Sequence, residues 1–150
     1  MTTYQREIAH LVMEDIKPLM RRHWEESGRH RDIPMAPNYP AYLNAEDQGL
    51  LRVFTARRDL ILLGYMIFFV GSLHYTLNKL AQLDLLYVLP ACRGGKVGYS
   101  LMRFSEDYLL TAGVDLIKHG MGLNHHYGCM LLKMGYEPIE TIYEKRCRHA

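Results

Sequence analysis

An uncharged apolar run, LILLGYMIFFVGSL at residues 60–73, constrains the fold of this chain more than any other feature. It falls short of the roughly 20 residues that a membrane-spanning helix requires. It is also rich in β-branched and aromatic residues and is interrupted by Gly64 and Gly71, which is typical of a buried strand. We therefore expect a strand in the protein core here, and no membrane association.

Further strand-like segments lie on either side of this run. Residues 50–56 precede it across a short polar turn, so the two segments predict an antiparallel hairpin. Residues 80–88 form a third candidate strand, and residues 115–121 form a shorter one. The last candidate, residues 138–147, alternates as strands do. The alternating sets are Ile139, Thr141 and Tyr143 against Glu140 and Glu144.

Helix-like segments occur before, between and after these strands. They lie at residues 8–20, 40–48, 101–113 and 125–134. Thr2 and Gln5 have the spacing of a capping box before the first helix, and Pro18 is expected to kink that helix or to start a second one. Asn38 suits the N-cap of the helix at residues 40–48, and Gly135 suits the end of the last helix.

This order of elements predicts an α/β fold in which a mixed, mostly antiparallel sheet is flanked by helices. The 150 residues suit a single domain, 1–150, with one core. Hydrophobic residues make up 49% and charged residues 23% of the sequence, as in ordinary soluble globular proteins. Because the three cysteines include no CxxC pair, we expect no disulfide framework, no metal site and a reducing cytoplasm.

A glycine-rich stretch, LPACRGGKVG at residues 89–98, connects the third strand to the next helix. Such a turn presents free backbone N–H groups at the positive end of a helix dipole. Its glycines allow positive φ angles and the close approach of a diphosphate, and Arg93 and Lys96 add positive charge. A tight turn that binds nothing is the alternative. The Walker and dinucleotide-binding patterns are both absent from the sequence.

The sequence around this turn resembles the GNAT superfamily of acyl-CoA-dependent N-acyltransferases. The family signature, a strand ending V-x-P and then [QR]-x-x-G-x-[GA], corresponds to residues 88–98, with Lys96 in the place of the middle glycine. Asn124 and the KMGY stretch at residues 133–136 resemble the family's last helix, and LGY at residues 63–65 resembles its central strand. The chain looks most like the GNAT proteins encoded by bacteriophages and bacteria.

The resemblance implies that acetyl-CoA is the cofactor and that it lies where the third strand splays from its neighbour. The diphosphate would meet backbone N–H groups of the loop and the first helical turn. These groups belong to Arg93, Gly94, Gly95, Lys96, Val97, Gly98 and Tyr99. The pantetheine arm would pair with the backbone near Leu86 and Val88, and an N–H at Val88 would polarise the acyl carbonyl. Asn124 would contact the cofactor from the last helix.

Direct attack of an amine on a thioester requires alignment of the reactants and removal of a proton. Asp84 is the candidate general base, because strand alternation would place it on one face with Val88; a carboxylate that faces solvent or pairs with an arginine is the alternative. The position of the family's usual acid tyrosine holds Leu131. Tyr127 one helical turn earlier, His125 or water could protonate the thiolate instead.

The acceptor is expected to be a primary amine of a small molecule or a protein, selected by residues 25–42 and by the turn at residues 57–59. Acidic and basic side chains are mixed there, so a nucleic-acid acceptor stays open, although the net charge of +2 gives no general argument for one. The other functions considered are a non-catalytic acyl-CoA-binding module of this fold and an enzyme that modifies a nucleic-acid base. The final strand could form the edge of a homodimer.

Overall fold

The computed structural model describes residues 1–73, 77–124 and 127–147 of the chain. These residues form two compact units, Met1–Gly120 and Met121–Ala150, which we describe separately. No helix in the described parts of the chain combines the length and the apolarity that crossing a membrane requires.

The first unit contains a five-stranded sheet in the order β1-β2-β3-β4-β5. The strands are β1 (Thr2–Glu7), β2 (Leu51–Arg58), β3 (Ile61–Ser72), β4 (Lys79–Val88) and β5 (Leu116–Lys118). β1 to β4 pair antiparallel, and β5 pairs parallel to β4. The mixed, mostly antiparallel sheet is therefore confirmed, as are the hairpin of β2 and β3 and the strand at the uncharged run.

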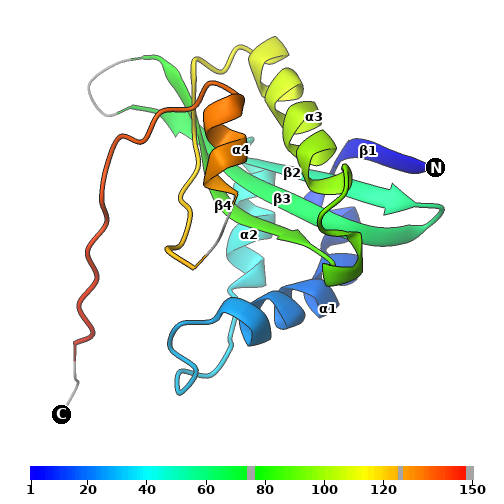
Figure 1. Cartoon of the computed structure of the whole chain (residues 1–150), viewed down its shortest axis with the longest axis vertical. Coiled ribbons are helices and arrows are strands. Elements are labelled where there is room, and N and C mark those ends of the chain that lie inside the picture. The colour runs from blue at the N-terminus through cyan, green and yellow to red at the C-terminus, as the bar shows by residue number, and fades with distance from the viewer. Residues whose placement is uncertain (74–76, 125–126, 148–150) are drawn as a thin grey trace. The chain divides into compact units, whose positions relative to one another are not determined.

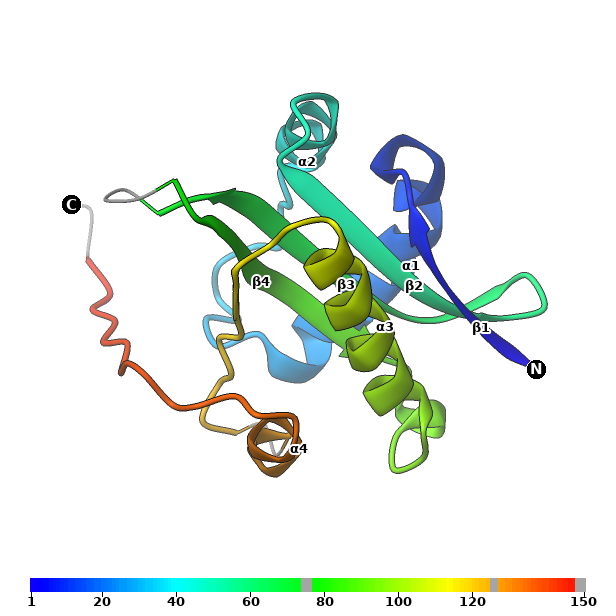
Figure 2. The ribbon, with the colours of Figure 1, turned by 90° about the horizontal axis from the view of Figure 1, so that it is seen from above.

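Helices cover both faces of this sheet (Figure 1). α1 (Ala9–Ser27) and α2 (Tyr39–Asp47) lie on one face, and α3 (Val97–Thr111) lies on the other, as the view from above makes clear (Figure 2). The flanking helices expected from the sequence are thus confirmed.

Each face of the sheet buries its own set of apolar side chains. On the face of α1, Val12 and Ile16 pack with Val53 and Ile67 in one cluster. On the face of α3, the ring of Phe54 meets three aromatic rings edge-on. They belong to Phe68, Phe104 and Tyr108. Alternate residues of β2 and β3 therefore serve opposite layers, as the period of a strand requires.

The N-terminal residues form a strand rather than the start of a helix. Thr2–Glu7 pairs with β2 along its whole length, so the predicted capping box of Thr2 and Gln5 is wrong. α1 begins only at Ala9, and its N-cap, Ile8, makes no side-chain capping bond. The capping-box spacing is a local signal, and the edge of β2 provides a competing set of backbone hydrogen bonds.

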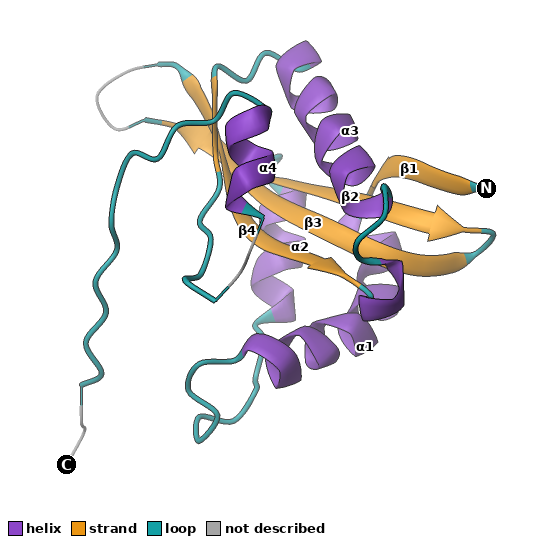
Figure 3. Cartoon of the chain, in the orientation of Figure 1, coloured by secondary structure: helices purple, strands orange, loops and turns teal. Residues whose placement is uncertain are grey.

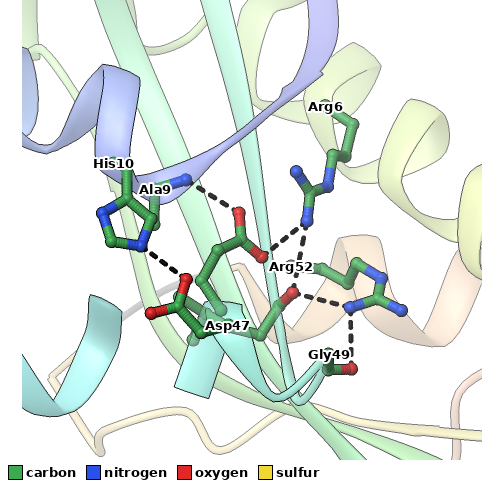
Figure 4. Close-up of polar contacts among 8 residues, drawn as sticks. Arg6, Ala9, His10, Asp47, Gly49 and Arg52 are labelled. Atoms are coloured by element: carbon green, nitrogen blue, oxygen red, sulfur yellow. Dashed lines mark hydrogen bonds and ion pairs between the residues drawn. The ribbon is translucent and has the colours of Figure 1, made fainter. Parts of the chain in front are cut away.

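A side chain from α2 caps α1 instead. One oxygen of the Glu46 carboxylate accepts a hydrogen bond from the backbone N–H of Ala9 at 2.8 Å, and the other accepts one from Arg6 at 2.7 Å. Beside it, His10 and Asp47 form an exposed pair with a separation of 2.7 Å (Figure 4). The start of α1 is therefore fixed by tertiary contacts between the first two helices.

The remaining helix signals have mixed outcomes. Pro18 lies inside α1, which continues to Ser27 as one helix, so a second helix does not start there. Asn38 is the N-cap of α2, as predicted, and its side chain accepts a hydrogen bond from the N–H of Ala41 at 3.1 Å.

The second unit contains α4 (Gly128–Lys133), which ends as predicted near Gly135, a residue with a φ of 92°. Beyond it, residues 137–147 have no regular secondary structure (Figure 3), so the predicted final strand is wrong. Ile139, Ile142 and Tyr143 are exposed. Alternation in sequence is not enough to make a strand, because a strand also needs a neighbouring edge to pair with.

Candidate functional site

The glycine-rich loop joins the end of β4 to the start of α3. A single 3-10 turn, Pro90–Cys92, leads to Gly94, whose φ of 78° lies in the left-handed region that favours glycine. α3 then begins at Val97, and its N-cap, Lys96, makes no side-chain capping bond. The first N–H groups of any helix have no intrahelical acceptor, and here the N-cap side chain supplies none either, which is the usual setting for binding a phosphate group.

β3 and β4 approach each other unusually closely beside this loop. A Cβ atom on Gly64 would lie 2.7 Å from the carbonyl oxygen of Tyr87 and 3.0 Å from a methyl carbon of Val88. Only glycine fits at this position, which gives a physical reason for the LGY motif in the sequence.

One edge of β4 loses its strand partner before the loop. β5 pairs with β4 only at Leu80, Ala81 and Gln82. Among the described residues, no strand continues this pairing toward Leu86 and Val88. The resemblance implies that the pantetheine arm lies along this part of β4, which stays a prediction.

Asp84 lies at a β-bulge in the middle of β4. Opposite it on β3, Phe68 pairs with Leu83 and Ile67 pairs with Leu85, so Asp84 is an extra residue without a partner across the ladder. An extra residue of this kind interrupts the alternation of side chains between the two faces of a sheet.

The predicted common face of Asp84, Leu86 and Val88 is therefore wrong. The hydroxyl of Tyr42 in α2 donates a hydrogen bond of 2.6 Å to Asp84 Oδ2, which places the carboxylate on the face of α1 and α2. Leu86 lies opposite Met66, which contacts α3, and Val88 lies close to the start of α3. The side chain of Asp84, the candidate base, thus faces α1 and α2, whereas the side chains of Leu86 and Val88 face α3.

Aromatic side chains connect the surroundings of Asp84 with the second half of α1. His23 Nδ1 lies 3.4 Å from the hydroxyl of Tyr65, and the His23 ring stacks on Tyr87 with ring centroids 5.0 Å apart. Burial raises the pKa of both Tyr42 and Tyr65, so these phenols stay protonated. Only Tyr65, as part of the LGY motif, stands out in the sequence; the cluster does not, because its members come from elements far apart along the chain.

The side chain of Arg93 is held toward α1. Its Nε donates to the carbonyl oxygen of Val88 at 2.7 Å, and its two terminal nitrogens donate to the two oxygens of Glu26, one of them at 2.9 Å. The guanidinium lies over the ring of Tyr87, 5.2 Å from its centroid. Its hydrogen bonds and charge lower the pKa of Glu26. The positive charge expected to face phosphate is therefore already paired with a carboxylate.

Two open hollows flank the loop. The larger, of about 530 Å³, lies between the end of α1 and the end of β4, and its lining includes Glu25, Glu26 and Tyr87. The smaller, of about 360 Å³, lies beside β1, and its lining includes Arg58 and Lys96. In the larger hollow, which Arg22 also lines, Glu26 is paired with Arg93, and Glu25 is the carboxylate that suits a cationic amine. The cations of the smaller hollow suit an anion.

The second unit carries the remaining predicted site residues. Tyr127 is the N-cap of α4, and its carbonyl oxygen accepts from the N–H of Leu131 at 3.2 Å. Burial raises the pKa of Tyr127. Asn124 lies in a turn before this cap, so it does not begin the helix, and His125 lies outside the described residues. The proposed roles of Asn124 and Tyr127 stay predictions.

No protein-family model matches this sequence, and no curated protein matches it. Several solved structures share its fold. An aminoglycoside acetyltransferase from an uncultured soil metagenomic sample, in complex with sisomicin, matches with a TM-score of 0.77 over 98% of this chain and 97% of its own, at 13% identity. The ribosomal-protein-alanine N-acetyltransferase of Brucella melitensis matches with a TM-score of 0.70 over 100% of both chains, at 15% identity.

A third structure contains the cofactor. It is an acetyltransferase from Clostridium acetobutylicum with acetyl-CoA, which matches with a TM-score of 0.75 over 97% of this chain and 96% of its own, at 12% identity. At these identities the likeness concerns the fold, which extends over nearly the whole of each chain. The chain therefore has the fold of the GNAT N-acetyltransferases.

Proposed function

We propose that this chain is an acetyl-CoA-dependent N-acetyltransferase that transfers an acetyl group to a primary amine. The observation that carries the proposal is the continuous path from the open edge of β4, through the glycine loop, to the uncapped first turn of α3. An amide-containing arm ending in a diphosphate would match this path, since strand edges bind amides and helix N-termini bind phosphates.

Backbone groups of the first unit would hold the cofactor. Leu86 and Val88 would pair with the arm, and the N–H groups of residues 94–99 would receive the diphosphate. The N–H of Arg93 already donates to the carbonyl of Pro90 at 3.2 Å, so the available donors begin at Gly94. When bound, acetyl-CoA supplies an acetyl group activated as a thioester.

Asp84 would manage the proton of the acceptor. An ammonium group must lose a proton before its nitrogen can attack, and a carboxylate can accept that proton directly or through water. The bulge directs Asp84 toward α2, beside the irregular residues that were expected to choose the acceptor. Tyr127, whose pKa burial raises, would keep its proton at neutral pH, as a general acid for the thiolate must.

An amine acceptor is supported by the solved structures of similar fold, which include an aminoglycoside acetyltransferase and a ribosomal-protein-alanine N-acetyltransferase. The carboxylate of Glu25 in the larger hollow agrees with a cationic acceptor, whereas that of Glu26 is already paired with Arg93. We further propose, from the sequence, one functional domain over 1–150, a cytoplasmic location and a bacteriophage or bacterial origin. A homodimer stays a proposal, but its edge would have to lie outside residues 138–147, which form no strand.

Release of free thiol from acetyl-CoA tests this function. The purified protein would be assayed with a panel that contains an aminoglycoside, a peptide with an N-terminal alanine, simple diamines and nucleotides. We expect thiol release with at least one amine. Binding of CoA without turnover on any acceptor would favour the non-catalytic module, and turnover on a nucleotide alone would favour the base-modifying enzyme. Failure to bind acetyl-CoA in calorimetry would reject the N-acetyltransferase and the non-catalytic module together.

Substitutions then test the proton roles. Asp84→Asn is expected to lower kcat by about 100-fold, because a positioned base contributes roughly that factor or more. Asp107→Asn, an exposed change on α3, is the matched control and should leave kcat unchanged. A Tyr127→Phe variant with full activity would remove the acid role of that residue without affecting the proposed activity.

A further inference from the structure

We propose that Arg93 is not a phosphate ligand but a brace for the cofactor loop, and that Glu26 of α1 is the positioning residue that holds this brace in place. The inference rests on the proposed function, because it concerns how the loop is prepared to bind CoA. It assigns to α1 a role in cofactor affinity, although α1 contributes no residue to the loop itself.

The guanidinium of Arg93 is engaged on three sides. Its Nε closes the turn by donating to the carbonyl of Val88, the last residue of β4, at 2.7 Å. Its two terminal nitrogens form a bidentate pair with Glu26, and its flat face lies over Tyr87. To reach a phosphate, the side chain would have to break its bidentate pair with the Glu26 carboxylate, the geometry in which arginine pairs are strong.

Two residues on one side of α1 build the receiving surface. His23 stacks on Tyr87, and Glu26, three residues later and hence on the same side of the helix, pairs with Arg93. The ring of Tyr87 in β4 contacts both His23 and the guanidinium of Arg93. The last turns of α1 therefore hold the segment just before the glycines against the end of β4.

The brace lies where it can set the conformation of the loop. Arg93 directly precedes Gly94, whose left-handed φ turns the chain toward α3. With Arg93 fixed on one side and the first turn of α3 on the other, the N–H groups between them keep one arrangement before any ligand arrives. Preorganisation of this kind raises affinity by lowering the entropy lost on binding.

The direction in which the Kd for CoA changes in one variant distinguishes a brace from a phosphate ligand. Glu26→Gln removes a negative charge near the diphosphate and releases Arg93, so simple electrostatics would tighten CoA binding or leave it unchanged. A brace predicts the opposite. We expect the Kd for CoA, measured by calorimetry, to rise about three- to tenfold in Glu26→Gln. Glu14→Gln, which removes an exposed carboxylate earlier in α1, is the control and should leave the Kd unchanged.

A second variant separates positioning from direct contact. Arg93→Lys keeps the charge but loses the fork, and we expect it to weaken CoA binding as much as Glu26→Gln does. The double variant should then be no weaker than either single one, because both changes break the same contact. The thermal midpoints should stay within about 2 °C of the wild type, since exposed pairs contribute little to stability.

Other results would overturn the inference. An unchanged or lower Kd in Glu26→Gln, or losses that add in the double variant, would mean that Arg93 acts on the cofactor independently of Glu26. If the wild-type protein does not bind CoA at all, the proposed function and the brace fall together. If the wild type binds CoA and Glu26→Gln binds it equally well, only the brace is rejected.

Discussion

The two ends of α1 are attached to the sheet by similar residues in different environments. Near its start, Glu46 caps the helix with only 7% of its side chain exposed. In the first half, Asp15 joins Glu7 on the guanidinium of Arg57, whose side chain is 11% exposed. At the far end, Arg93 and Glu26 are 41% and 42% exposed.

This difference separates a structural role from a functional one. A buried charge without its partner costs several kcal/mol, so Arg57 and Glu46 must be paired for the domain to fold. An exposed pair contributes little to folding and is therefore free to serve the loop. The same Arg–Glu chemistry can stabilise the protein at one end of a helix and prepare a binding site at the other.

The largest expected effect comes from breaking the buried network. Arg57→Met leaves the carboxylate of Glu7 without its bidentate partner, and we expect a loss of about 3 to 4 kcal/mol in the free energy of unfolding, measured in urea. Arg58→Met, an exposed change at the next position, should cost less than about 0.5 kcal/mol. Equal losses in both variants would contradict the distinction by burial.

A histidine on the other face of the sheet tests burial through pH. Burial lowers the pKa of His119 from 6.5 to about 4, so between these values the unfolded chain binds a proton that the folded protein does not. Stability should therefore fall as the pH falls from 6.5 to 4, by about 2 kcal/mol after allowance for partial exposure. Between pH 7 and pH 4, the free energy of unfolding should fall less in His119→Gln than in the wild type. An identical fall in both proteins would mean that burial does not lower the pKa of His119.

Removing the cap of α1 should have an intermediate effect. Glu46→Ala leaves the N–H of Ala9 without its acceptor and Arg6 without its ion pair, and we expect a loss of about 1 to 2 kcal/mol in unfolding free energy. Asp47→Ala removes the exposed pair with His10 and should cost less than about 0.5 kcal/mol. A larger loss from Asp47→Ala than from Glu46→Ala would reverse the assignment of the cap.

The smallest expected effect on stability is that of Glu26→Gln, about 0.5 kcal/mol or less in the same unfolding assay. Because Arg93 lowers the pKa of Glu26, this contribution is present above the ordinary pKa of 4.5 and is lost as the pH falls through the lower folded value. A loss of more than about 1.5 kcal/mol in the free energy of unfolding would mean that this pair stabilises the fold, as the buried pairs do, and would weaken its proposed role in the loop.

The sequence predicted the strands and helices that have an apolar pattern or bounding glycines of their own. The apolar runs of β2, β3 and β4 were sufficient to predict these strands, and the glycines at the two ends of α3 were sufficient to predict that helix. β1 was not predicted. Thr2–Glu7 is short and polar, and it becomes a strand through pairing with β2. The segment at 137–147 shows the reverse case, since its alternation has no pairing edge in the described second unit.

The candidate site was predictable in part for the same reason. The loop at residues 89–98 is contiguous, so its glycines and its position between a strand and a helix could be read directly. The Arg93–Glu26 pair joins residues 67 positions apart, and no local pattern links them. The reversed orientation of Asp84 depends on register with β3, which side-chain periodicity alone does not contain.

The bulge at Asp84 makes one residue of β4 dispensable for the register of the strand. Replacing Asp84 by another residue would leave every later side chain on its present face. Deleting it would restore simple alternation and leave Leu85 opposite Ile67 and Tyr87 opposite Tyr65, so that Tyr87 would stay beside His23. The middle of this strand can therefore lose one residue without an exchange of its two faces, which an unbulged strand cannot do.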